Sequence, residues 1–472
     1  MRAITIALLA LTTASTPARA QSPSPYSLPT DPVLSRLISE SLSALPELRS
    51  TQALVRAQAA RVPQAGALPD PMIQVGIQND GFTSWEVGEM ENSYYSIMAS
   101  QAFPWPGKRG LRSEIAELGV GQSKRAVERL RLSTEADVRR LYIALILVRD
   151  RLAVQGRLVV LWEKSAEVAR AVYEAGGGSQ ADLLRSQLEL GRLKQRRVAL
   201  QAEERTLVQG LNRLRGHALD EAIVTPVHLA ELGTPALIDE KAAVEHALAS
   251  SPELAAARIS VNEAGRRITL AKKSYYPDLT VSAGIMPRGV DLPPMWLLTV
   301  GGAIPMWAGR KQDRAVEESE ALAAASRSTA LGFEQVLRLR VGERLTALSA
   351  LMETIRIYRE GLLVQSEATA ESTLAQFRVG KVGFTAVLDA NAGLLADEDA
   401  FLQAIAEAQR LAIAAYEISL EPVPLSAGGA MSRAGMPGLG AMGAASAAST
   451  TTSDASASEG ASAGTDRSMS GM

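Results

Sequence analysis

Hydrophobic positions along this chain follow two different periods, and each change of period predicts a change of element. Across residues 31–61 apolar side chains recur at the spacing of one helix face, at Leu34, Leu37, Ile38, Leu42 and Leu45. Residues 72–79 and 93–103 instead alternate with the two-residue period of a strand. Their apolar sets are Ile73, Val75 and Ile77, and then Tyr95, Ile97, Ala99 and Phe103. The pattern predicts a helix, stopped by the proline-rich segment 63–71, and then a strand hairpin.

Helical spacing returns after Gly107 and continues to about Tyr173. At about 1.5 Å per residue such a helix is roughly 100 Å long, which is typical of a coiled coil rather than of a globular domain. The run Gly176-Gly177-Gly178-Ser179 breaks it, and a second helix is expected over 180–215. The sequence therefore predicts a long antiparallel helical hairpin, residues 107–215.

The same plan then occurs a second time. Residues 240–274 predict a helix, 278–286 and 295–305 a strand pair, and 309–420 a second hairpin that turns at 380–383. Four landmarks recur in order, each shifted by roughly 200 residues, which indicates a tandem duplication. They are Pro46-Glu47-Leu48 with Pro252-Glu253-Leu254, Pro69-Asp70 with Pro277-Asp278, Pro104-Trp105-Pro106-Gly107-Lys108 with Pro305-Met306-Trp307-Ala308-Gly309-Arg310, and Tyr173 to Leu184 with Phe377 to Leu388. We predict a first structural repeat over 21–215, an equatorial linker over 216–239, and a second repeat over 240–425.

The two ends have their own composition. Arg2, a short apolar run and Ala18-Arg19-Ala20 predict an export signal over residues 1–20. Residues 426–472 are rich in Ala, Ser, Gly and Met and predict a disordered tail. The chain has no Cys, so disulfides, thiolate sites and a lipid-accepting Cys are excluded. No later run of about 20 apolar residues predicts a membrane-spanning helix.

The four predicted strands have the length and alternation of transmembrane β-strands. An open four-stranded sheet has unsatisfied edges in lipid, and bacterial barrels have about 8 strands or more. In a membrane several copies would therefore have to pool their strands, and three copies would supply twelve. The alternative is a small sheet in water, in a soluble periplasmic coiled-coil scaffold or adaptor.

These residues resemble one known family, the TolC-type outer-membrane factors of tripartite efflux pumps. The resemblance runs over about residues 31–420 and includes the duplication, Leu68-Pro69-Asp70-Pro71, the two tip segments, and Gln101 to Arg109. The Pro-Gly-Lys-Arg sequence looks most like the heavy-metal efflux branch, CzcC-like and CusC-like.

The resemblance implies a mainly α fold with transmembrane β. Duplicated helical hairpins would form an α-barrel tunnel in the periplasm, and the four strands would be one third of a 12-stranded barrel in a homotrimer. The implied partners are outer-membrane lipid, a periplasmic adaptor (membrane fusion) protein and an inner-membrane transporter of the resistance-nodulation-division type. Its implied function is passive exit of heavy-metal cations, with organic compound efflux or type I protein secretion as alternatives.

By the same resemblance, the two hairpin tips close the periplasmic end and contact the adaptor. The tip motifs indicate Gly176, Asp182 and Gly380 as contact positions. Arg185, Arg378 and Lys381 lie close by and are candidates for ion pairs with Asp182 or Glu174 that hold the tips shut.

Asp389 is the candidate pore gate, because the family carries an acidic position just after the second tip. Three symmetry-related carboxylates in a narrow neck would repel one another and attract cations. Ala386 stands where relatives often carry a second acid, so a single ring is expected. The alternative is an ordinary solvated carboxylate on the helix surface.

No motif in the chain predicts catalysis, a cofactor or a metal centre. His217, His228 and His246 have no ligand spacing, and the Met residues of the tail are a weak candidate for Cu(I) or Ag(I). Gly107-Lys108-Arg109 lacks the other residues of a phosphate loop. A net charge of −2 gives no reason to expect a nucleic-acid partner.

Overall fold

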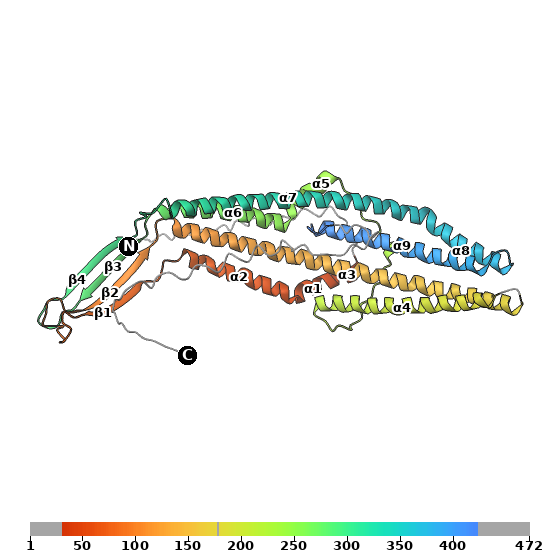
Figure 1. Ribbon diagram of the computed structural model, residues 1–472, viewed down its shortest axis with the longest axis horizontal. Helices are drawn as coiled ribbons and strands as arrows, with labels where there is room; N and C mark the ends of the chain where they lie inside the picture. The colour runs from red at the N-terminus through yellow and green to blue at the C-terminus, as the bar shows by residue number, and fades with distance from the viewer. Residues whose placement is uncertain (1–30, 177–178, 423–472) are drawn as a thin grey trace, which may run out of the picture. The chain divides into compact units, whose positions relative to one another are not determined.

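The computed structural model describes residues 31–176 and 179–422, all within the first of two compact units, Met1–Val423. The predicted export signal (1–20) and the predicted tail (426–472) lie outside the described residues. Long helices extend from one end of a small sheet, and the turns of both helical hairpins lie at the end away from that sheet (Figure 1).

Each repeat begins with a helix that a proline divides in two. Helices α1 (Pro32–Ala44) and α2 (Pro46–Gly66) correspond to α5 (Glu240–Ser250) and α6 (Pro252–Lys272). Leu45 and Ser251, the residues before the two prolines, have nearly the same extended backbone, with φ/ψ of −60°/117° and −67°/118°. The predicted single helices over 31–61 and 240–274 were therefore wrong at these points, because a proline disfavours helical backbone in the residue before it. Helix α2 also continues through Pro63 to Gly66, farther than the sequence predicted.

The strands form one antiparallel sheet in the order β1-β2-β3-β4. Its members are β1 (Met72–Gln78), β2 (Tyr94–Phe103), β3 (Leu279–Met286) and β4 (Met295–Gly302), so β2 and β3 join the two repeats. The register places Ile73, Ala99, Ala283 and Leu298 in one row across the sheet, through the pairs Ile73↔Ala99, Ala99↔Ala283 and Ala283↔Leu298. The apolar positions predicted for each strand thus share one face.

Two long hairpins complete the repeats. Helix α3 (Lys108–Glu174) turns back into α4 (Gln180–Arg215). In the second repeat, α7 (Gln312–Ile357) passes through a π-helical segment, η3 (Tyr358–Leu362), into α8 (Leu363–Arg378), and α9 (Phe384–Tyr416) returns. The first arm of this predicted hairpin is therefore helical throughout, with a π-helical segment at η3 that the sequence did not predict. Short 3-10 helices, η1 (Leu229–Glu231) and η2 (Lys273–Tyr275), complete the described elements.

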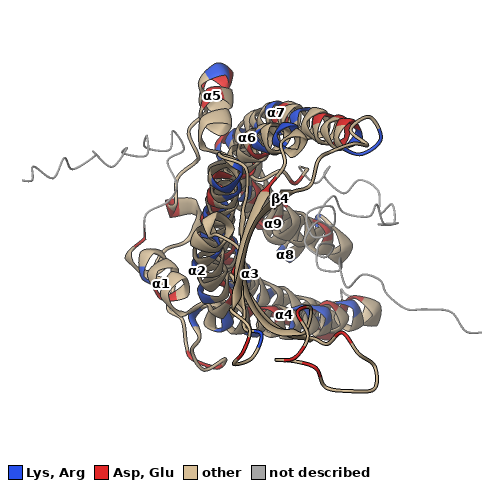
Figure 2. Cartoon of the chain, turned by 90° about the vertical axis from the view of Figure 1, so that its left-hand side faces the viewer, with Lys and Arg blue, Asp and Glu red and all other residues tan. Residues whose placement is uncertain are grey.

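The main hydrophobic core lies along the middle of α3. Tyr142, Leu145 and Ile146 of α3 are fully buried there with Leu211 of α4 and Ile413 of α9. Near the sheet, α3 packs against both α2 and α6, and α6 packs against α7. Lys, Arg, Asp and Glu residues occur on the helices and loops, whereas the four strands contain none (Figure 2). The sheet is therefore chemically distinct from the rest of the described chain.

Candidate functional site

Both hairpin tips end a helix with a glycine in the left-handed region. Gly176 has φ of 75° and Gly380 has φ of 70°. At the second tip, the N–H of Gly380 donates to the carbonyl of Phe377 at 3.0 Å, and the N–H of Lys381 donates to the carbonyl of Gln376 at 2.9 Å. These bonds satisfy the last carbonyls of α8, as expected at a glycine-terminated helix. Residues 177–178 of the first tip lie outside the described chain.

The second tip is closed by an aromatic pair that the sequence reading missed. Phe377 ends α8 and Phe384 begins α9, and their ring centroids are 5.3 Å apart. Both rings are buried in a separate cluster with Leu374, Val387 and Ala169, the last from α3. This cluster attaches the second tip to the first hairpin. The sequence signal was the pair of large apolar residues flanking Val379 to Gly383.

Replacing Gly380 by alanine is expected to lower the free energy of unfolding by about 1 kcal/mol, because a Cβ disfavours the left-handed backbone. No atom outside the turn lies within 4 Å of the position that this Cβ would take, so the cost is conformational rather than steric. Gly383→Ala is the matched control, since Gly383 has an ordinary φ of −77°. Thermal denaturation of both variants checks the difference, and equal midpoints would contradict it.

Asp182 lies in the first turn of α4, next to the described part of the first tip. Ser179 caps this helix, and its hydroxyl accepts the N–H of Ala181 at 3.1 Å. Arg185 lies 4.0 Å from the Asp182 carboxylate, and Glu174 pairs with Arg170 at 2.9 Å. Arg378 and Lys381 are exposed and form no ion pair within the described ranges. The roles of all these residues in adaptor contact or tip closure stay predictions.

Asp389 lies in the second turn of α9 with its side chain exposed. Its carboxylate has no hydrogen bond or ion pair within the part of the chain that the structure describes, although buried Val387 and Phe384 fix the backbone beside it. An unpartnered carboxylate on a rigid helix near the second tip is compatible with a ring of charge around a pore. It is equally compatible with a solvated surface residue, so the gate remains a prediction.

The three histidines lie apart and have separate partners. His217 pairs with Glu221 at 2.8 Å, and the hydrogen bond that the His228 ring donates to the Asp150 carboxylate raises the pKa of His228 above its ordinary value. Burial lowers the pKa of His246. Across residues 31–176 and 179–422, no group of three or more His, Cys, Asp or Glu side chains is arranged to hold a metal ion.

A second feature missed from the sequence is the contact between the β2–α3 passage and the start of β3. The Lys108 ammonium group, whose side chain is 9% exposed, donates to the Asp278 carboxylate at 2.7 Å and to the Tyr276 carbonyl at 3.0 Å. The same carboxylate oxygen accepts a hydrogen bond from the backbone N–H of Trp105 at 2.7 Å. The Trp105 ring stacks on the Tyr276 ring, with centroids 5.0 Å apart. We call this contact the junction. It joins repeat one to repeat two, and its signal was the recurring Pro-Asp and Gly-Lys/Arg.

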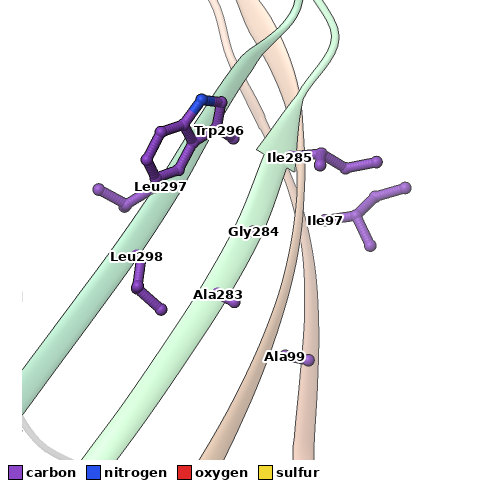
Figure 3. Close-up of a pocket in the computed structure, with 8 residues that line it drawn as sticks. All are labelled: Ile97, Ala99, Ala283, Gly284, Ile285, Trp296, Leu297 and Leu298. Carbon is purple, nitrogen blue, oxygen red and sulfur yellow. The ribbon is translucent and has the colours of Figure 1, made fainter.

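The apolar face of the sheet is open in the single chain. A shallow depression on it is lined by Ile97, Ala99, Ala283 and Ile285 together with Trp296 and Leu298 of β4 (Figure 3). Trp296 is 78% exposed and Val75 of β1 is 75% exposed. Exposed apolar surface of this extent is typical of a surface that contacts lipid or a partner. No helix within the described ranges has the length and apolar composition needed to cross a membrane.

Comparison with known proteins gives consistent results for sequence and fold. Residues 243–418 match the family model described as outer membrane efflux protein. The nickel and cobalt resistance protein CnrC of Cupriavidus metallidurans is 25% identical over 276 residues, which is 58% of this chain and 64% of CnrC. The alignment therefore spans less than two thirds of that relative.

Solved structures of outer-membrane channels share the fold. A structure of CusC superposes with a TM-score of 0.71 at 18% identity, covering 84% of this chain and 94% of that one. The outer-membrane channel OprN gives 0.69 at 19% identity, covering 82% and 90%, and VceC of Vibrio cholerae gives 0.67 at 16%, covering 81% and 95%. Part of the chain, residues 243–418, thus matches the outer membrane efflux protein family, and more than four fifths of the chain shares the fold of solved outer-membrane channels.

Proposed function

We propose that this protein is the outer-membrane channel of a tripartite efflux pump and that three copies form a passive exit duct for heavy-metal cations. The observation that carries the proposal is the charge-free sheet, with an exposed apolar face and two edge strands, β1 and β4, that have no partner within the described chain. In lipid such edges must be paired by further strands. Three copies supply twelve strands, a number within the range of bacterial barrels.

The helices support the same assembly. Helix α2 exposes Leu54, and α7 exposes Leu322, Leu331 and Leu339, with Leu54 61% exposed. Apolar side chains on helices of this length are normally buried against other helices. A ring of hairpins from three copies would cover them and enclose a tunnel.

The proposed partners follow from this role. A periplasmic adaptor would meet the tips at Gly176, Asp182 and Gly380, and an inner-membrane transporter of the resistance-nodulation-division type would supply the energy. Similarity to a nickel and cobalt resistance protein favours heavy-metal cations. Organic compound efflux and type I protein secretion are the alternatives within the same duct. The duct itself performs no chemical step.

Light scattering of the protein purified in detergent from outer-membrane fractions tests the assembly. We expect a detergent-dependent particle of three chains, and a strain lacking the protein should become more sensitive to nickel or cobalt salts than the complemented strain. A water-soluble monomer or dimer would instead support the periplasmic scaffold. Unchanged metal sensitivity with increased sensitivity to organic compounds would retain the duct and replace its substrate.

A further inference from the structure

The duplication allows the junction inside one chain to predict a contact between two chains. Inside the chain, Lys108 follows the last strand of repeat one and Asp278 precedes the first strand of repeat two. Their counterparts are Arg310, which follows β4, and Asp70, which precedes β1. Like Lys108, Arg310 comes directly after a glycine, and like Asp278, Asp70 comes directly after a proline.

The counterparts are unused in the single chain. Asp70 and Arg310 are both exposed, and neither side chain forms a hydrogen bond or ion pair with any residue that the structure describes. Trp307, near the position equivalent to Trp105, is 72% exposed. Asp70 lies next to β1 and Arg310 follows β4, and these two edge strands are three strand spacings of about 4.8 Å apart. They therefore cannot meet within one copy.

We propose that Asp70 and Arg310 form a second junction, which is completed only when Arg310 of one copy reaches Asp70 of the next. This inference rests on the proposed ring of three copies and assigns the residues that close it. The second junction differs from the first in two ways. The passage from Pro305 to Gly309, before Arg310, is one residue longer than that from Pro104 to Gly107, before Lys108. The Arg310 guanidinium can also bind a carboxylate in a bidentate manner, which the Lys108 ammonium cannot.

The sheet register supports this assignment. Adding 208 to a residue number of β1 gives the equivalent residue of β3, and adding 201 to a number of β2 gives the equivalent residue of β4. With these offsets the pair Ile73↔Ala99 of β1 and β2 becomes Val281↔Val300, which is an observed pair of β3 and β4. The pair Ile77↔Tyr95 likewise becomes the observed pair Ile285↔Trp296. The repeats therefore have the same internal register. The same offsets also relate the contact between repeats to the contact between copies.

Applied to the pairs Ile97↔Ile285 and Ala99↔Ala283 between β2 and β3, the same shifts give the contact between copies. Leu298 of β4 lies opposite Ile77 of the next copy's β1, and Val300 lies opposite Val75. All four side chains belong to the apolar face, as a continuous sheet requires, whereas a slip of one residue would place them on opposite faces. The helices agree, because α3 packs on α6 within the chain and the equivalent contact is α7 on α2 of the next copy.

A charge exchange tests the second junction. We expect Asp70→Arg and Arg310→Asp each to lower the temperature at which the detergent-solubilised trimer dissociates, by about 5 °C, and the double variant to recover at least half of the loss. Asp70→Arg with Lys311→Asp is the matched control and should show no recovery. If the wild type is trimeric and both single variants dissociate at its temperature, the inference is overturned while the duct stands.

Cysteine cross-linking tests the register independently of these charges. The chain has no Cys, so Val75→Cys with Val300→Cys should give covalent dimers and trimers on mild oxidation, and reduction should reverse them. Val75→Cys with Thr299→Cys places the second thiol on the opposite face and should give neither. Equal cross-linking of both pairs overturns the register, and a wild type that never forms a multimer overturns the proposed function as well.

Discussion

Replacing Leu298 by arginine is expected to remove the protein from the outer membrane almost completely. Leu298 lies in the middle of β4 on the apolar face and is 59% exposed in the single chain. An arginine on the lipid face of a barrel costs about 2–4 kcal/mol at the membrane midplane. Three copies would together lose roughly 6–12 kcal/mol, since each contributes one arginine. Immunoblots of outer-membrane fractions, compared with whole-cell extracts, measure the loss.

Thr299→Arg is the control, because the neighbouring residue points to the opposite face. Ser282, its partner in β3, and Ser100, the next residue in the same row, are also small and polar. An arginine there would face the interior of the proposed barrel and should leave insertion nearly unchanged. Equal loss from both variants would mean that the apolar face does not contact lipid. Normal insertion of Leu298→Arg would contradict the orientation of the sheet.

The sequence predicted the faces of the sheet because a strand has a period of two and each strand keeps its alternation to the end. Ile73 and Ala99 were assigned to the apolar faces of two separate strands, and the register places them in one row with Ala283 and Leu298. The pairing of β2 with β3, between repeats, depends on contacts about 180 residues apart in sequence. No local pattern specifies that pairing.

Helix breaks were predicted less well than helix existence. The prolines at 46 and 252 were read as landmarks of the duplication, although the same residues divide each first helix in two. The π-helical segment Tyr358–Leu362 has no Pro and a single Gly. Its local sequence is compatible with an ordinary α-helix, so the periodicity could not reveal it.

The junction shows which site residues a single sequence can and cannot reveal. Asp278 and Lys108 were both noted as repeated landmarks, but 170 residues separate them and no spacing rule connects them. Their contact follows from the order of the strands, because β3 must start where β2 ends. The tip glycines were recognisable locally, since a left-handed residue ends a helix, and the structure places Gly176 and Gly380 in that conformation.

Replacing Asp389 by asparagine is expected to lower the cation selectivity of the reconstituted channel by roughly threefold to tenfold. In the proposed trimer, three carboxylates ring the narrow end, and like charges in a constriction produce potentials of several kT. Asparagine keeps the size of the side chain and removes only the charge. Asp389 is exposed and its neighbour Val387 is buried, so the substitution leaves the packing of the second tip intact. Reversal potentials in planar bilayers under a salt gradient measure the effect, and it should weaken at high ionic strength because the charges are screened.

Glu371→Gln removes the same charge from α8, where the carboxylate is also exposed and unpaired within the described residues. This control should leave the reversal potential nearly unchanged, since the proposed ring is formed by Asp389 of α9 and includes no residue of α8. An equal shift in both variants would indicate a general surface-charge effect instead of a ring at Asp389. If Asp389→Asn has the selectivity and conductance of the wild type, Asp389 is a solvated surface residue. The trimeric duct would then need a different constriction, and the buried pair of Phe377 and Phe384 would hold the tip without a ring of charge.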